Sequence, residues 1–96
     1  MTPEVPRVHP LKTDKAPFEP LFLGWKTAEF RKDDRGFKLG DQLHLREVDE
    51  RKIPTGRTVI AQITHIQTGY GIPHGYCMLS FRRLRIYFSP DDFASV

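Results

Sequence analysis

The sequence predicts an α+β fold that is mostly β: a small barrel of about five strands with one short N-terminal helix. Residues 57–67 and 76–87 alternate apolar and polar side chains, which is the pattern of strands buried on one face. Glycine and proline clusters separate the alternating segments, as turns do. At 96 residues the chain is long enough for one domain. Several short strands and one helix in that length favour a closed or partly closed barrel.

The chain divides into an extended lead-in over residues 1–8, a domain over residues 9–87 and a polar tail over residues 88–96. The lead-in has two prolines after the start and no apolar periodicity. A first short strand is expected over residues 8–12. In the tail, Phe93 is expected to pack back on the domain.

A short helix is expected next. Thr13 or Asp14 can cap its N-terminus, and Gly24 is a natural C-terminal stop. Phe18, Leu21 and Phe22 recur at helical spacing and should face the core. Pro20 removes an amide and clashes with the preceding turn, so the helix should be short, kinked or partly 3₁₀.

The remaining elements are strands joined by turns. In a strand over residues 26–32 side chains alternate, which would place Lys26 with Ala28 and Phe30, and Glu29 with Arg31. The other strands should include Leu43 and Leu45, residues 57–67 and residues 76–87, with buried Cys77, Leu79 and Phe81. The expected turns and loops are residues 33–36, Gly40-Asp41, residues 53–56 and residues 68–75.

Several motifs carry a family resemblance. Gly24-x-Lys26-x-x-Glu29-x-Arg31 looks like the signature of the ASCH domains, a branch of the PUA-like β-barrels. Residues 31–41 resemble a small ASCH-like family of uncharacterised function from bacteria and phages. His9-Pro10-Leu11-Lys12 and the stretch 70–76 match its opening and closing motifs in order, so the resemblance covers residues 9–81. It implies a PUA-like barrel, with Phe37 in the core. Pro17 and Pro20 depart from the family pattern.

The resemblance implies RNA binding, because the wider group is associated with it. Lys26 and Arg31 would contact phosphate or a base edge, and Glu29 would accept from a base amine or orient Lys26. A structural ion-pair network is the alternative role for these three side chains. The cleft is expected between the helix and the barrel. Its binding residues would be Lys12, Trp25, Lys26, Glu29, Arg31, Lys32, Arg35 and Tyr70. Trp25 and Tyr70 offer rings on which bases stack.

An enzymatic function is an open alternative. Some similar proteins resemble nucleases or amidohydrolases of modified cytidines, in which a lysine works with a threonine and a glutamate. Lys26, Thr27 and Glu29 would then be the catalytic residues. The position that matches the amidohydrolase threonine is Glu29, so the set is incomplete for that chemistry. A third possibility is a phage-type accessory protein that binds a host protein through the Arg82–Arg85 strand or the tail.

Composition sets the remaining limits. The net charge of +3 and the pI of about 9.2 are compatible with nucleic acid. No apolar run reaches membrane-spanning length, no signal peptide is expected from the residues at the start, and the single cysteine, Cys77, cannot form an internal disulfide. These features predict a cytoplasmic protein that does not bind membranes. His74-x-x-Cys77 lacks a second pair at zinc spacing, so neither metal nor cofactor is expected.

Overall fold

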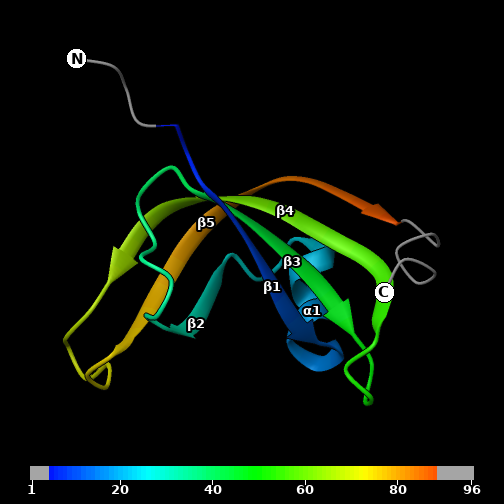
Figure 1. The fold of residues 1–96 in the computed structure, drawn as a ribbon, viewed down its shortest axis with the longest axis horizontal. Helices are drawn as coiled ribbons and strands as arrows, with labels where there is room; N and C mark the ends of the chain where they lie inside the picture. The colour runs from blue at the N-terminus through cyan, green and yellow to red at the C-terminus, as the bar shows by residue number, and fades with distance from the viewer. Residues whose placement is uncertain (1–4, 89–96) are drawn as a thin grey trace.

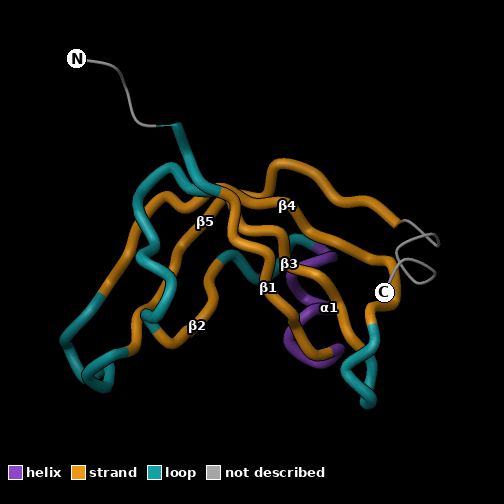
Figure 2. The backbone as a smooth tube through the Cα atoms, in the orientation of Figure 1, coloured by secondary structure: helices purple, strands orange, loops and turns teal. Residues whose placement is uncertain are grey.

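The computed structural model describes residues 5–88, and the predicted α+β, mostly β class is confirmed (Figure 1). One helix and five strands follow one another in the chain. They are β1 (Val8–Asp14), α1 (Lys15–Leu23), β2 (Ala28–Lys32), β3 (Gln42–Val48), β4 (Pro54–Gln67) and β5 (Tyr76–Phe88). Figure 2 shows the short helix beside β1 and β3, on the concave side of the curled sheet. The Phe93 prediction and most of the tail lie outside the described residues.

All five strands form one sheet in the order β1-β3-β4-β5-β2. The pairing of β1 with β3 is parallel, and the other three pairings are antiparallel. The sheet curls into a half-barrel, so its two edge strands, β1 and β2, are brought toward one another (Figure 1). Two strands that are distant in the sheet therefore face each other across an open seam.

The core lies on the inner face of the sheet, beneath α1. The expected alternation holds: Leu43, Leu45, Cys77, Leu79 and Phe81 are all buried. Phe18 and Leu21 of α1 are also buried against this face, and Phe22 packs at its margin. Phe37 is 8% exposed and belongs to the same cluster, as predicted.

The helix is short, with nine residues, and it continues past Pro20. Proline removes the amide that would bond to the carbonyl of Ala16, but Ala16 is exposed, so water can solvate that carbonyl. Asp14 occupies the N-cap position without a side-chain capping bond, which corrects the predicted role of its carboxylate. Gly24 ends the helix with φ of +86°, as predicted.

Two predicted boundaries are wrong. β2 begins at Ala28, so Lys26 and Thr27 precede the strand. β4 begins at Pro54, within the segment predicted to be a loop, and the turn lies earlier. The side chain of Asp49 forms that turn by accepting from the backbone N–H groups of Arg51 and Ile53, at 2.8 and 3.0 Å. Proline is tolerated at the first position of a strand, where its missing donor is not needed.

A candidate binding cleft between the edge strands

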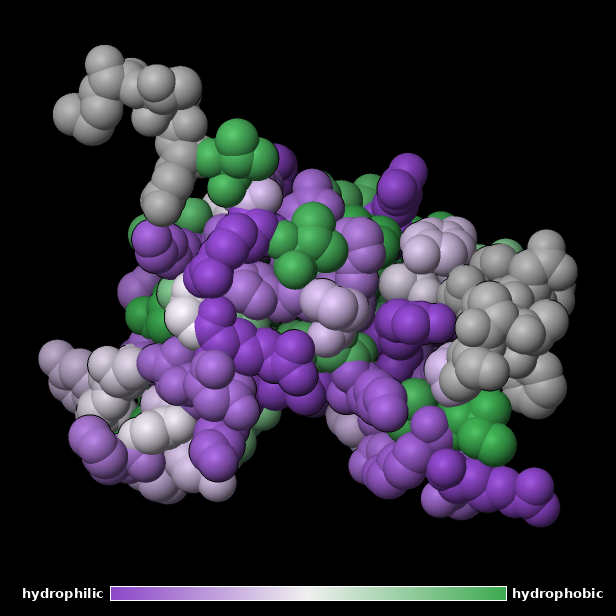
Figure 3. Space-filling view, in the orientation of Figure 1, coloured by the Kyte–Doolittle hydropathy of each residue, from purple (hydrophilic) through white to green (hydrophobic). Residues whose placement is uncertain are grey.

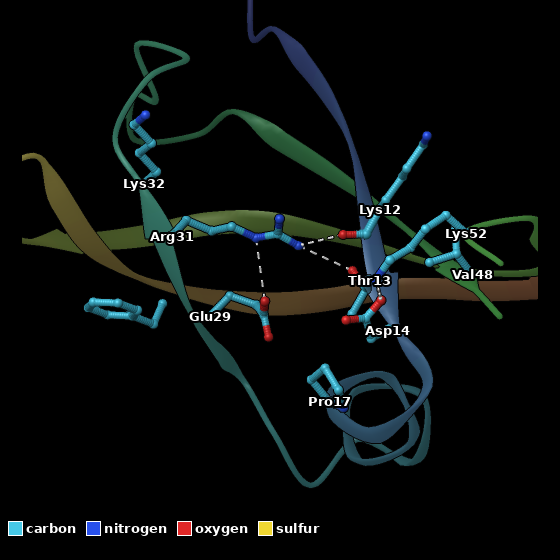
Figure 4. Close-up of a pocket in the computed structure, with 10 residues that line it drawn as sticks. Lys12, Thr13, Asp14, Pro17, Glu29, Arg31, Lys32, Val48 and Lys52 are labelled. Carbon is cyan, nitrogen blue, oxygen red and sulfur yellow. Dashed lines mark hydrogen bonds and ion pairs between the residues drawn. The ribbon is translucent and has the colours of Figure 1, made fainter. Parts of the chain in front are cut away.

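The seam between β1 and β2 is bridged by Arg31. Its Nη2 donates to the backbone carbonyl of Lys12 at 3.0 Å and lies 3.3 Å from Oγ1 of the buried Thr13 (Figure 4). The carbonyl of Lys12 lies on the edge of β1 that faces away from β3. Arg31 thus takes the place of a neighbouring strand at this point and links the two edges of the half-barrel.

Glu29 lies beside Arg31 and is 6% exposed. Its Oε1 accepts from Lys26 Nζ at 2.7 Å, and its Oε2 lies 3.5 Å from Arg31 Nε. A buried carboxylate needs such partners because desolvation is costly. The structure therefore brings together the three residues of the Lys-Glu-Arg motif.

The predicted arrangement of faces on β2 is partly wrong. Lys26 precedes the strand and turns toward Glu29, instead of sharing a face with Phe30. The ring of Phe30 is on the other face, 48% exposed, and stacks on Tyr76 with centroids 5.3 Å apart and planes 4° from parallel. The turn before the strand decides where Lys26 points, and strand periodicity does not reach that far.

An open cleft of about 520 Å³ lies along this seam. Figure 3 shows the hollow in the surface between the part over β2 and the part over β1 and α1. Four cationic side chains and two carboxylates are among its lining residues. The lining comprises Lys12, Thr13, Asp14, Pro17, Glu29, Phe30, Arg31, Lys32, Val48 and Lys52.

The cationic side chains of the cleft differ in whether they have a partner. Lys52 Nζ pairs with Asp14 at 2.6 Å, and Arg31 bonds to β1. Among residues 5–88 neither Lys12 nor Lys32 has a carboxylate partner, and Figure 4 shows both ammonium groups pointing to the same side of the view. These two charges are available to an anion.

Sequence reasoning missed several lining residues. Thr13 and Asp14 follow the His-x-Leu-Lys segment directly, so the alternation of that strand was a usable signal for them. Lys52 comes from the β3–β4 turn, where it adopts φ of +65°. No local pattern links that turn to β2, and only the curl of the sheet brings the two together.

Other predicted residues lie outside the lining. Trp25 is 83% exposed beside Lys26, and Thr27 is exposed, with its backbone carbonyl accepting from the N–H of Phe81. Arg35 donates to the carbonyl of Pro10 at 3.4 Å, farther along the same edge of β1. Tyr70, 95% exposed, borders a separate hollow at the end of β4. Their roles in binding stay predictions.

Comparison with known proteins places these features in a family. The model of the family described as "Domain of unknown function (DUF3850)" matches residues 8–81. The chain belongs to this family. It is also 40% identical over 60 residues to a protein of Escherichia phage P2 described as "Uncharacterized 12.9 kDa protein in GpA 3'region". That match covers 62% of this chain and 54% of the phage protein, so the chain spans about half the length of the relative.

A second constellation of the DUF3850 domain is buried beneath the loop between β2 and β3. His9 Nε2 lies 2.8 Å from Asp41 Oδ2, and both residues are less than 7% exposed. Asp41 also accepts from the backbone N–H groups of Arg7 and Lys38. Burial raises the pKa of Asp41, but these hydrogen bonds outweigh burial, so the pKa is lowered overall. This arrangement ties the loop to β1.

A third constellation surrounds Arg57 on the inner face of the DUF3850 domain. Arg57 donates to both oxygens of Glu47, at 3.0 and 2.7 Å, and to Glu19 of α1 at 2.8 Å. Its guanidinium lies over the rings of Phe18 and Phe22. The hydrogen bonds from Arg57 lower the pKa of Glu47 against the opposing effect of burial, and they raise the pKa of Arg57. This cluster fastens the helix to the sheet, away from the cleft.

Two further groups bear on the chemistry that the domain can support. Burial raises the pKa of the Cys77 thiol, which leaves it a poor nucleophile. Within residues 5–88, no three His, Cys, Asp or Glu side chains gather closely enough to hold a metal ion. The only helix in the same range, α1, is too short to cross a bilayer.

Proposed function

We propose that this domain is an RNA-binding module that holds RNA, or a modified nucleotide within it, in the cleft between β1 and β2. The observation that supports this most is the pair of unpartnered ammonium groups, Lys12 and Lys32, at a cleft whose interior contains the buried carboxylate of Glu29. Lysines contact phosphates as mobile point charges, while a carboxylate accepts from the exocyclic amine of a base. The cleft's volume of about 520 Å³ is within the range of ligand sites.

Family resemblance adds weight to the proposal. The Gly-x-Lys-x-x-Glu-x-Arg motif resembles that of ASCH domains in the PUA-like superfamily, whose members are associated with RNA. In this chain Glu29 and Arg31 line the cleft, and Lys26, which lies outside the lining, contacts Glu29 from the preceding turn. We assign Lys26 and Arg31 a positioning role: they hold the carboxylate of Glu29 in place at the seam.

The test is fluorescence-anisotropy binding of a single-stranded RNA, with duplex DNA of matched length for comparison. Lys32→Gln removes an unpartnered charge of the cleft. Lys38→Gln also removes one positive charge, from a loop hollow outside the cleft, and controls for the change in net charge. One lost phosphate contact should weaken RNA binding about fivefold at 0.1 M salt, because affinity for single strands falls with about the 0.7 power of salt concentration per contact. Equal affinities of the two variants would refute the proposal.

A small hydrolase is the second candidate function, favoured by the direct contact of Lys26 Nζ with Glu29 Oε1 at 2.7 Å. Such a pair can pass a proton to or from a reacting group. Turnover of a modified cytidine or of RNA, abolished by Glu29→Gln in a folded protein, would establish it. Binding without turnover would leave the non-enzymatic module.

A further inference from the structure

The outer face of the sheet, opposite α1, is formed by side chains that alternate with those of the core. The strand registers align them in three rows of four residues across β1, β3, β4 and β5. The middle row, for example, runs from Pro10 through His44 and Ile60 to Arg85. The rows on either side run from Val8 to Arg82 and from Lys12 to Tyr87.

The three rows carry charge of one sign, and Asp14, the next exposed residue of β1 beyond them, pairs with Lys52. Lys12, Arg46, Arg82 and Arg85 belong to the three rows, and no residue of these rows is Asp or Glu. Lys12, Arg82 and Arg85 are exposed, and Tyr87 is 40% exposed. The part of the chain that the structure describes is close to balanced in charge elsewhere, so this one-sided distribution is a local feature. Figure 3 shows hydrophilic side chains, with apolar ones among them, over the region of β1 and β3.

His44 lies at the centre of the face, and its pKa depends on the charges around it. Its neighbours across the strands, Pro10 and Ile60, are uncharged, and the cation Arg85 follows in the same row. Gln42 and Arg46 flank it on its own strand. Burial and then the charge of Arg85 lower the pKa of His44 from 6.5. The charged form of the imidazole is therefore disfavoured in this positive environment.

The cleft and the outer face share Lys12. Its backbone carbonyl bonds to Arg31 at the seam, its side chain lines the cleft, and its register position is on the outer face. From β1 to β5 the face spans three strand spacings, about 14 Å. A polyanion that leaves the cleft beside Lys12 can continue over the sheet without crossing an acidic residue of these rows.

We propose that the outer face of β1, β3, β4 and β5 is a second contact surface for single-stranded RNA, which binds its sugar-phosphate backbone through Arg82, Arg85 and Lys12. The inference rests on the proposed function, because the cleft supplies the anchored end of the strand. Charge complementarity selects a polyanion, and the exposed ring of Tyr87 gives one base a surface on which to stack. A sheet surface with cations and an aromatic ring is suited to a single strand, whose bases are free to stack.

The experiment compares two fluorescein-labelled RNAs, oligo(U) of 4 and of 16 nucleotides, over a salt series. The short RNA can occupy the cleft alone, and the long one can reach the outer face. Arg82→Gln/Arg85→Gln removes two charges of the face, and Lys32→Gln removes one charge of the cleft. At 0.1 M salt the double variant should bind the 16-mer about 25-fold more weakly, with a salt slope smaller by about 1.4. Its affinity for the 4-mer should not change.

The outcomes separate the two surfaces. If Lys32→Gln weakens RNA binding and the double variant does not, the proposed contact on the outer face is overturned and the cleft is retained. If the double variant weakens binding of the 16-mer and Lys32→Gln does not, the contact on the outer face is supported and the cleft is overturned as an RNA site. An equal loss for both RNA lengths in the double variant, or no RNA binding by the wild type, overturns the inference.

A second measurement needs no substitution. Phosphates placed on the outer face stabilise the imidazolium, so the pKa of His44 should rise when the 16-mer is added, and it should stay unchanged with the 4-mer. Histidine ring NMR signals followed over pH 5–8 report this value. His74, in the loop between β4 and β5, is the internal control. An unchanged His44 pKa at saturating 16-mer would overturn the inference even if the double variant failed to fold.

Discussion

Arg31→Ala tests whether the half-barrel is held closed by a side chain. Arg31 is the residue of β2 that bonds across the seam to β1, at the Lys12 carbonyl and Thr13 Oγ1. The substitution also removes the 3.5 Å contact with Glu29, which then keeps Lys26 as its partner. The two edge strands would lose their direct link at this point, and the buried Thr13 hydroxyl would lose a donor.

The expected cost follows from these contacts. A hydrogen bond that involves a charged group contributes about 1.5–3 kcal/mol. Because the Arg31 side chain is 24% exposed, we take its two bonds and the ion pair together at about 2–3 kcal/mol, no more than one full bond of this kind. A 96-residue domain has roughly 5–14 kcal/mol of total stability. The melting temperature should therefore fall by about 10–20 °C.

The assay is urea unfolding monitored by circular dichroism, with wild type alongside. Arg35→Ala is the matched control, because Arg35 also donates to an edge carbonyl of β1, at 3.4 Å, from a side chain that is 48% exposed. It should cost less than about 1 kcal/mol. Arg31→Lys keeps the charge but loses the planar fork, so it should recover less than half of the loss. Stabilities of Arg31→Ala and Arg35→Ala within 0.5 kcal/mol of one another, about the error of such data, would refute the reasoning.

Three other predictions concern the rest of the domain. The pKa of Glu47 is lowered from 4.5, so the stability that this carboxylate contributes is present above pH 4.5 and is lost as the pH falls through its folded pKa. Urea unfolding at pH 7, 5 and 3 should show this loss of stability. In Glu47→Gln the dependence of stability on pH should be weaker. Asp41→Ala should cost about 3 kcal/mol, because it leaves two backbone N–H groups and His9 without their acceptor, whereas the exposed Asp34→Ala should cost almost nothing in the same assay. Gly24→Ala should cost about 1–2 kcal/mol, because φ is +86° and a Cβ would lie 3.2 Å from the Arg83 guanidinium; a neutral effect on the melting temperature would contradict this.

Local sequence patterns located most of the fold. Two-residue alternation identified the buried positions of β3, β4 and β5, because a half-buried strand places successive side chains in different environments. Gly24 marked the end of the helix, because glycine adopts the positive φ of this position without strain. The errors were at boundaries: Pro54 suggested a loop but begins a strand, because the Asp49 side chain forms the turn earlier. The sheet order, with a parallel β1–β3 pair, has no local signal.

For the candidate site, too, local sequence indicated one part of the arrangement and the tertiary structure decided the other. By itself the sequence placed Lys26, Glu29 and Arg31 within six residues of one another, but its strand periodicity put Lys26 on the opposite face from the other two. Only the tertiary structure decided that Arg31 bonds to β1, that Lys12 and Lys32 face one cleft, and that Lys52 lines it too. These partners meet because the sheet curls until its edges approach. That curl results from strand pairings and registers summed over the whole chain, and no short segment contains it.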